Sequence, residues 1–203
     1  MNAYNSLEEL FYSIAEVLKN NSKTSQEIQA NNFKSFILVE NFSDCDYRVK
    51  ALCDGSIKKI IAEDLAGAAR IGNYAFWKCT NLTSVEIPDS VTSIGYQAFY
   101  NCSGLTSVVM PDGLTDIKDQ AFQNCGIAEV VIPNSVARIN AYSFANCTSL
   151  SCITFKGMSE LYANAFYGCP NLTTINVPWA EGEVANAPWG ATNATINYNY
   201  QGE

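Results

Sequence analysis

The hydrophobic positions of this chain recur along the sequence with a period of 22 or 23 residues. The marker is a Phe preceded by a small residue, and successive copies lie 23, 23, 22 and 22 residues apart. A Cys follows three places after each Phe, and an aliphatic residue lies five places before it. A repeat of this length indicates a solenoid in which each coil is one structural unit. The five copies are Phe76, Phe99, Phe122, Phe144 and Phe166.

A second apolar set after each Cys predicts one β-strand per coil. In the first copy it reads Leu82-x-x-Val85-x-Ile87, and Pro88 follows. Because Val85 and Ile87 are two residues apart, both side chains point to one face of a strand and Glu86 points to the other. One such strand cannot bury its apolar face alone, so stacked copies should pair into a parallel sheet over a shared core. The proline then ends the strand, because it lacks an N–H and fixes φ.

Across the five copies the consensus is I-x-x-x-A-F-x-x-C-x-x-L-x-x-V-x-I-P-x-x-V. Over about residues 56–178 it resembles the BspA-like leucine-rich repeat of bacterial surface proteins. The combination of the A-F pair, the Cys and the I-P pair is specific to that subfamily. The resemblance implies a right-handed solenoid found on cell surfaces, without a particular ligand. We therefore predict an α/β fold class dominated by strands, with a short helical turn at each Ala-Phe pair.

The two ends of the chain depart from the repeat. Apolar residues at helical spacing predict an amphipathic helix over residues 5–20, so we interpret residues 1–45 as an N-terminal helical segment and linker. This segment is also similar to those that precede such repeats in prophage-encoded proteins of gut Firmicutes. The solenoid is expected over residues 46–203. It comprises a cap coil at 56–71, five repeats at about 71–178, and a C-terminal cap or remnant of a further coil at 179–203.

Within the C-terminal cap, aromatic side chains should close the open end of the core, because a solenoid needs its last layer covered. We expect Trp179, Pro188 and Trp189 to cover this layer, and residues 194–198 to add an edge strand.

Composition then excludes several classes of function. The net charge is −8, from 12 basic and 20 acidic residues, and no basic cluster occurs, which argues against nucleic acid and anionic membranes as partners. The chain has no His, so a Ser-His-Asp triad, a Cys-His dyad and any imidazole metal site are excluded. No apolar run is long enough to span a membrane, and residues 1–9 do not resemble a signal peptide. We expect no enzyme activity, no cofactor and no metal.

The five repeated cysteines form what we call the cysteine ladder: Cys79, Cys102, Cys125, Cys147 and Cys169. Residues one coil apart cannot converge on one metal ion, whereas disulfides between neighbouring coils remain open. We favour a third interpretation, a column of small buried thiols that packs between coils. Cys152 lies outside the ladder at an outward position, where it is either an exposed thiol or a tolerated substitution.

The outward residues of the predicted strands form a candidate binding face, because solenoids bind extended partners on such surfaces. We call this the strand face, and its candidate residues are Ser84, Glu86, Ser107, Val109, Glu129, Val131, Thr154, Thr174 and Asn176. A second group lies beside the Ala-Phe turns and provides either another contact surface or a shield for the Phe residues. It consists of Tyr74, Tyr96, Tyr100, Tyr142, Tyr162 and Tyr167.

The sequence thus favours a non-catalytic recognition module that binds a protein or a glycan at a bacterial or phage surface. The partner's identity is open. The alternative is a structural role, in which the repeats act as a spacer in a phage tail or another surface assembly.

Overall fold

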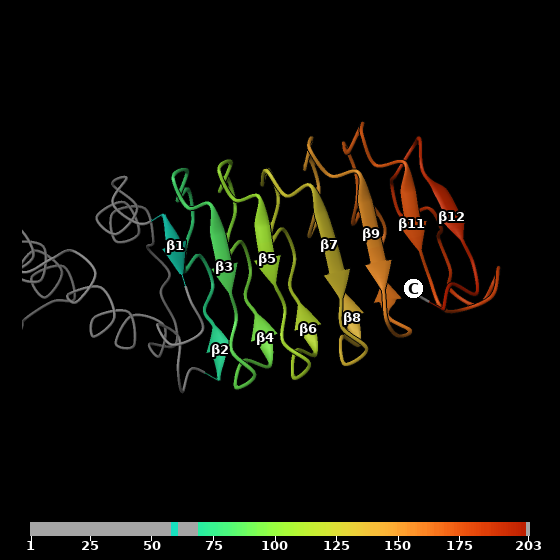
Figure 1. Ribbon diagram of the computed structural model, residues 1–203, viewed down its shortest axis with the longest axis horizontal. Coiled ribbons are helices and arrows are strands. Elements are labelled where there is room, and N and C mark those ends of the chain that lie inside the picture. Colours follow the sequence, from blue (N-terminus) through green and yellow to red (C-terminus); the bar gives the residue numbers. More distant parts are fainter. Residues whose placement is uncertain (1–57, 61–68, 202–203) are drawn as a thin grey trace, which may run out of the picture.

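The protein is a solenoid of stacked coils (Figure 1). The computed structural model describes residues 58–60 and 69–201. The expected helix over residues 5–20, with the rest of the N-terminal segment, lies outside the described residues.

Each repeat contributes one longer strand at the expected V-x-I segment, and these strands pair in parallel. Their register joins equivalent residues of successive coils, for example Val85 with Val108 and Ile153 with Ile175. The repeat spacing therefore sets the register. The strands of the five repeats are β3 (Ser84–Glu86), β5 (Ser107–Val109), β7 (Glu129–Ile132), β9 (Cys152–Phe155) and β11 (Thr174–Asn176). Among the described residues, the long strand β1 (Lys59–Ile60) precedes them in the stack and β12 (Thr195–Asn197) follows.

A second parallel sheet, which the sequence did not reveal, forms from two-residue strands at the aliphatic position before each Ala-Phe pair. Its side chains Ile71, Ile94, Ile117 and Ile139 lie in register and are almost fully buried. A strand of two residues is too short to show the alternation of apolar and polar residues from which a strand is predicted. The strands are β2 (Arg70–Ile71), β4 (Ser93–Ile94), β6 (Asp116–Ile117), β8 (Arg138–Ile139) and β10 (Glu160–Leu161).

The long strands form two separate sheets. β5 and β7 are neighbours at the boundary, but no strand pairing joins them. The third copy has one residue fewer between its Cys and its aliphatic residue, and it has Ala128 where neighbouring coils have Thr or Ser. In those coils the hydroxyl donates to the preceding coil, as Thr106 Oγ1 does to the carbonyl oxygen of Thr83 at 3.2 Å. Ala128 has no hydroxyl to donate such a bond. This coil joins its predecessor through the core, the second sheet and hydrogen bonds between the turn segments, such as that from the N–H of Phe99 to the carbonyl oxygen of Ala121 at 2.8 Å.

The segment at each Ala-Phe pair is a run of β-turns, so the expected short helical turn is wrong. Backbone N–H groups donate to the carbonyl three residues back, as from Ala75 to Gly72 and from Cys79 to Phe76. Left-handed φ angles of 59° at both Tyr74 and Lys78 prevent the chain from continuing as a helix. Among the described residues there is no helix, and this part of the chain is all β where α/β was expected.

The centre of the solenoid is a column of aromatic rings. Phe99 and Phe122 stack with ring centroids 5.0 Å apart and an interplanar angle of 2°. The column ends on Trp189, whose ring lies 6.4 Å from that of Phe166. Trp189 follows Phe166 by 23 residues, so it takes the Phe place in a further coil.

Both tryptophans of the C-terminal segment lie in the core, as expected. Trp179 and Trp189 are buried, and Trp179 packs edge-on against Phe155 with centroids 5.3 Å apart. The expected edge strand is β12, in register with β11. Pro188 is exposed, so its expected part in covering the core is wrong.

Candidate binding surface

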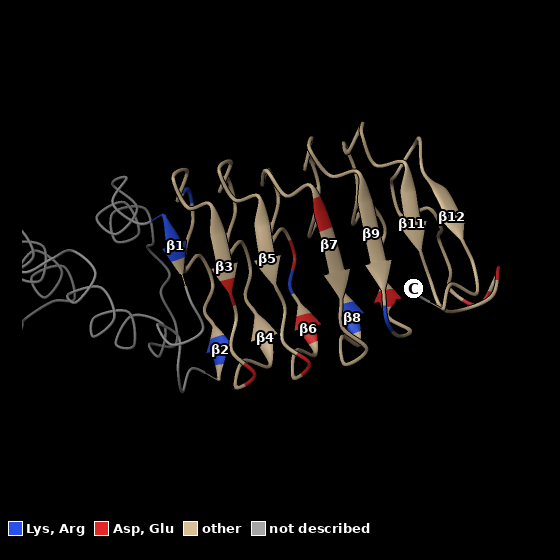
Figure 2. Ribbon diagram, in the orientation of Figure 1, with Lys and Arg blue, Asp and Glu red and all other residues tan. Residues whose placement is uncertain are grey.

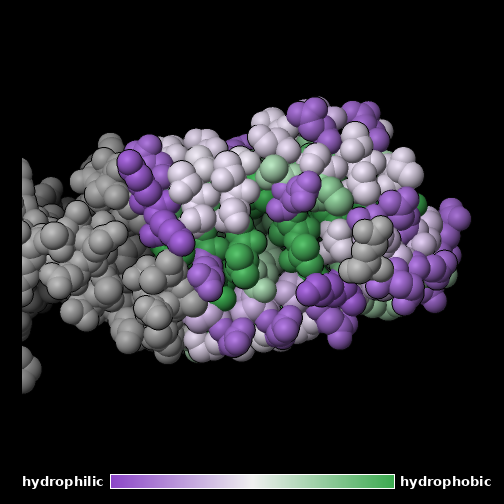
Figure 3. Space-filling model, in the orientation of Figure 1, coloured by the Kyte–Doolittle hydropathy of each residue, from purple (hydrophilic) through white to green (hydrophobic). Residues whose placement is uncertain are grey.

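The strand face carries an exposed apolar patch at the junction between β5 and β7. Val109 and Val131 keep 56% and 48% of their surface exposed, the largest values among Val, Ile and Leu side chains of the described core strands. Val108, next to Val109 on β5, is half-buried and packs against the core. Figure 3 shows hydrophobic side chains gathered in the middle of this face, with hydrophilic residues around them. We call Val109 and Val131 the valine patch.

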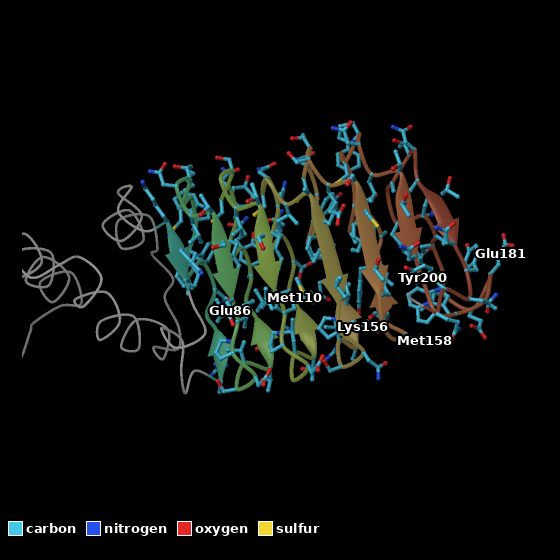
Figure 4. The ribbon with its side chains drawn as sticks, viewed as in Figure 1. Glu86, Met110, Lys156, Met158, Glu181 and Tyr200 are labelled. Carbon is cyan, nitrogen blue, oxygen red and sulfur yellow. The ribbon has the colours of Figure 1, made fainter. Side chains whose placement is uncertain are left out.

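Charged side chains flank the valine patch on both sides. Glu86 on β3 pairs in register with Val109, and Glu129 opens the same strand as Val131. Both carboxylates are exposed, as is Lys156, which follows β9. Strands β5, β9, β11 and β12 carry no charged residue (Figure 2). Glu86 and Lys156 lie at the same end of the long strands (Figure 4).

The C-terminal part of the strand face is occupied by hydrogen bonds within the protein. Asn176 Nδ2 donates to Thr154 Oγ1 at 3.0 Å, and Asn197 Nδ2 donates to Asn176 Oδ1 at 2.8 Å. Asn176 is only 7% exposed, although its strand position predicts an outward side chain. Thr154 and Thr174 are half-buried. This region is therefore less available to a partner than the valine patch.

The remaining candidate positions of the strand face are small and polar. Ser107 is exposed and Ser84 is half-buried, and the two lie in register on neighbouring strands. They offer hydroxyl groups beside the valine patch without blocking access to it.

The cysteine ladder is a column of buried thiols for four of its five members, each with the same hydrogen bond. Each Sγ donates to the carbonyl oxygen of the Phe one coil earlier, as from Cys147 to Phe122 at 3.1 Å. The four free thiols are Cys102, Cys125, Cys147 and Cys169. Cys79 is disulfide-bonded, so the expectation of a free thiol is wrong at that position.

Burial keeps the thiols of Cys125, Cys147 and Cys169 protonated at neutral pH. Removal from water raises the pKa of Cys125 well above its ordinary value, and the nearby thiol of Cys102 raises it further. Burial also raises the pKa of Cys169 to about 11, against an ordinary 9.0. A thiol is a poor nucleophile while it is protonated, so the cysteines of the ladder contribute to packing and not to nucleophilic chemistry.

Cys152 differs from the ladder, because it is a half-buried free thiol on the strand face. Asn176 Nδ2 lies 3.7 Å from its Sγ atom. Within the described ranges no group of three or more acidic, Cys or His side chains is arranged to hold a metal ion. The part of the chain that the structure describes also contains no helix fit to cross a membrane.

The tyrosines beside the turns divide into packed and exposed members. Tyr74 and Tyr96 contact each other edge-to-face, with ring centroids 5.2 Å apart. Tyr162 and Tyr167 are 43% and 56% exposed, too open to serve only as a shield for the Phe column. Tyr100 is half-buried and closer to the shielding role.

Paired strands with a repeating core of Phe, Cys and aliphatic residues define a leucine-rich repeat solenoid. A family model described as "BspA type Leucine rich repeat region" matches residues 69–186 in six copies. The match covers more than half of the chain, so this protein belongs to the BspA-type leucine-rich repeat family. Proteins of this family are non-enzymatic repeat proteins that generally serve as protein-binding modules.

Similar solved structures are bacterial leucine-rich repeat proteins. One from Bacteroides ovatus is 35% identical with a TM-score of 0.51, over 59% of this chain and 30% of that protein. The T. pallidum leucine-rich repeat protein TpLRR is 29% identical with a TM-score of 0.57, over 61% and 60%. One from Eubacterium ventriosum shares the fold at 23% identity and a TM-score of 0.60, over 72% and 37%.

In each case the match spans less than two thirds of the other protein. No curated protein matches this chain.

Proposed function

We propose that this protein is a non-catalytic recognition module of a bacterial or phage surface, and that it binds an extended protein segment on its strand face. The observation that carries the proposal is the valine patch. Two β-branched apolar side chains lie half-exposed on adjacent strands of a face that is otherwise small and polar. Contiguous apolar surface on a soluble protein marks interaction sites.

The charges around the patch indicate the chemistry of the partner. Glu86 and Glu129 are exposed carboxylates on either side of the two valines. Opposite charges across an interface speed association and fix its register. The partner that fits this surface is an extended peptide with aliphatic or aromatic side chains between Lys or Arg residues.

A library of random peptides tests the proposal, because it samples many partner sequences at once. Random dodecapeptides displayed on phage would be selected on the full chain, and the enriched peptides measured by isothermal titration. The proposal predicts that Val109→Thr together with Val131→Thr weakens binding about tenfold or more, since each valine loses apolar contact. Tyr96→Thr, which removes exposed apolar surface beside the turns, is the matched control and should bind as the unchanged protein does.

The same experiment separates recognition from a purely structural role. A spacer has no reason to select peptides, so failure to enrich any sequence contradicts the proposal. Enriched peptides that bind the double valine variant as tightly as the unchanged protein contradict it as well, because they locate the contact elsewhere.

A further inference from the structure

Exposed tyrosines gather on the turn segments of two adjacent coils. Tyr142, Tyr162 and Tyr167 are 37%, 43% and 56% exposed. The rings of Tyr142 and Tyr167 lie 6.2 Å apart at an interplanar angle of 78°. Together with Asn146 and Asn164 of the same turns, these residues form what we call the tyrosine patch. The patch is separate in sequence and position from the long strands that carry the valine patch.

The tyrosine patch contains no charge. The chain has no Asp, Glu, Lys or Arg between Arg138 and Lys156, nor between Glu160 and Glu181. Turn segments of an earlier coil do carry charges, at Lys118 and Asp119. A surface without formal charge cannot form an ion pair with its ligand, so a neutral molecule fits it better than an ionic one.

The patch also presents polar groups that the protein leaves available. Asn164 Nδ2 donates to the Tyr142 hydroxyl at 3.3 Å, which fixes both side chains. Within the described part of the chain, no hydrogen bond is formed by the hydroxyls of Tyr162 and Tyr167 or by the side-chain amide of Asn146. An amide and a phenol both donate and accept hydrogen bonds, which suits a ligand that bears many hydroxyl groups.

The scaffold holds these side chains in place before a ligand arrives. The N–H of Asn146 donates to the carbonyl oxygen of Tyr167 at 2.7 Å, so the two turns are tied together. A Cβ on Gly190 in the following coil would lie 3.1 Å from the Tyr167 nitrogen, which shows how closely that coil supports the turn. Tyrosine loses little side-chain entropy on binding, since it has only two rotatable angles.

From these observations we propose that the tyrosine patch is a binding site for a neutral glycan. Sugar C–H groups would pack on the tyrosine rings, while sugar hydroxyls exchange hydrogen bonds with Asn146, Tyr162 and Tyr167. The site does not depend on peptide binding at the strand face, so either proposal can fail while the other holds.

A glycan array that carries neutral and acidic oligosaccharides tests the site, with the best neutral oligosaccharide then measured by isothermal titration. We expect neutral glycans to be bound and Tyr162→Ala with Tyr167→Ala to weaken binding about tenfold or more. Because both residues are exposed, the variant should keep the unfolding midpoint of the unchanged protein. Tyr96→Ala and the double valine variant are controls that should retain full affinity.

Two results would overturn the proposal. One is the absence of binding to any neutral glycan on the array. The other is equal affinity of the double tyrosine variant and the unchanged protein. Peptides whose binding requires Tyr162 and Tyr167 would assign the patch to a protein partner, which would also reject it.

Discussion

The Sγ atom of Cys147 lies 3.1 Å from the carbonyl oxygen of Phe122 and donates a hydrogen bond to it across one coil. The same contact joins Cys125 to Phe99 and Cys169 to Phe144. It explains why Cys and Phe recur together: the ring fills the core, and the thiol gives the Phe carbonyl of the previous coil a second donor. An alanine would leave both space and an acceptor, whereas a longer side chain would not fit between stacked coils.

Substitution of Cys147 separates packing from hydrogen bonding. Cys147→Ala removes the donor, and we expect it to lower the free energy of unfolding by about 1–2 kcal/mol. Cys147→Ser keeps a donor of similar size, so it should be more stable than Cys147→Ala in urea unfolding followed by tryptophan fluorescence. If Ala proves the more stable of the two, the thiol acts only as an apolar filler.

The raised pKa of Cys169 predicts a loss of stability at alkaline pH. The thiol titrates at about 11 in the folded protein and near 9.0 once unfolded. Its contribution to stability is therefore complete below pH 9 and is lost as the pH rises toward 11, because the unfolded state releases its proton first. For one thiol, the free energy of unfolding falls by at most about 1.4 kcal/mol per pH unit in this range.

Urea titrations between pH 8 and pH 11 measure this slope. Cys169→Ala should flatten it, and the difference between the two proteins isolates this thiol, since all tyrosines and lysines are common to both. Equal slopes would show that the thiol titrates normally in the folded state.

Gly157 fits a gap that has no room for a side chain. A Cβ at this position would lie 2.7 Å from the Cα of Asn134 in the preceding coil. We expect Gly157→Ala to lower the free energy of unfolding by about 1–3 kcal/mol, because the coils must separate to admit the methyl group. At Gly72 nothing lies within 4 Å of such a Cβ, so Gly72→Ala is the matched control and should change stability by about 0.5 kcal/mol or less. A similar effect at both glycines would contradict the tight stacking at Asn134.

Features that recur once per coil could be predicted from the sequence, because repetition turns a weak local signal into a strong one. The strand at Val85 and Ile87, the buried cysteines and the closing edge strand follow from this pattern. Trp189 was harder to place as a further copy, since it replaces Phe, and the small residue and Cys around it do not recur.

Local backbone geometry and contacts between coils were beyond the sequence pattern. The left-handed φ of Tyr142 turns its segment into successive β-turns. A tyrosine in a sequence does not predict that conformation, because residues other than Gly, Asn and Asp seldom adopt it. Asn176 has an outward position by alternation, but hydrogen bonds with Thr154 and Asn197 bury it. Such effects depend on which residue the neighbouring coil supplies.

Thiol labelling of the native protein tests the stacked-coil account most directly. The protein would be treated with iodoacetamide at pH 8, before and after unfolding in urea, and the modified peptides identified by mass spectrometry. Because the stacked coils enclose them, four thiols should stay unmodified in the native state: Cys102, Cys125, Cys147 and Cys169. The half-buried Cys152 should react first among the free cysteines of the described part. All five should react once the chain is unfolded. Rapid modification of Cys125 or Cys147 in the native protein would show that the coils do not enclose a shared core.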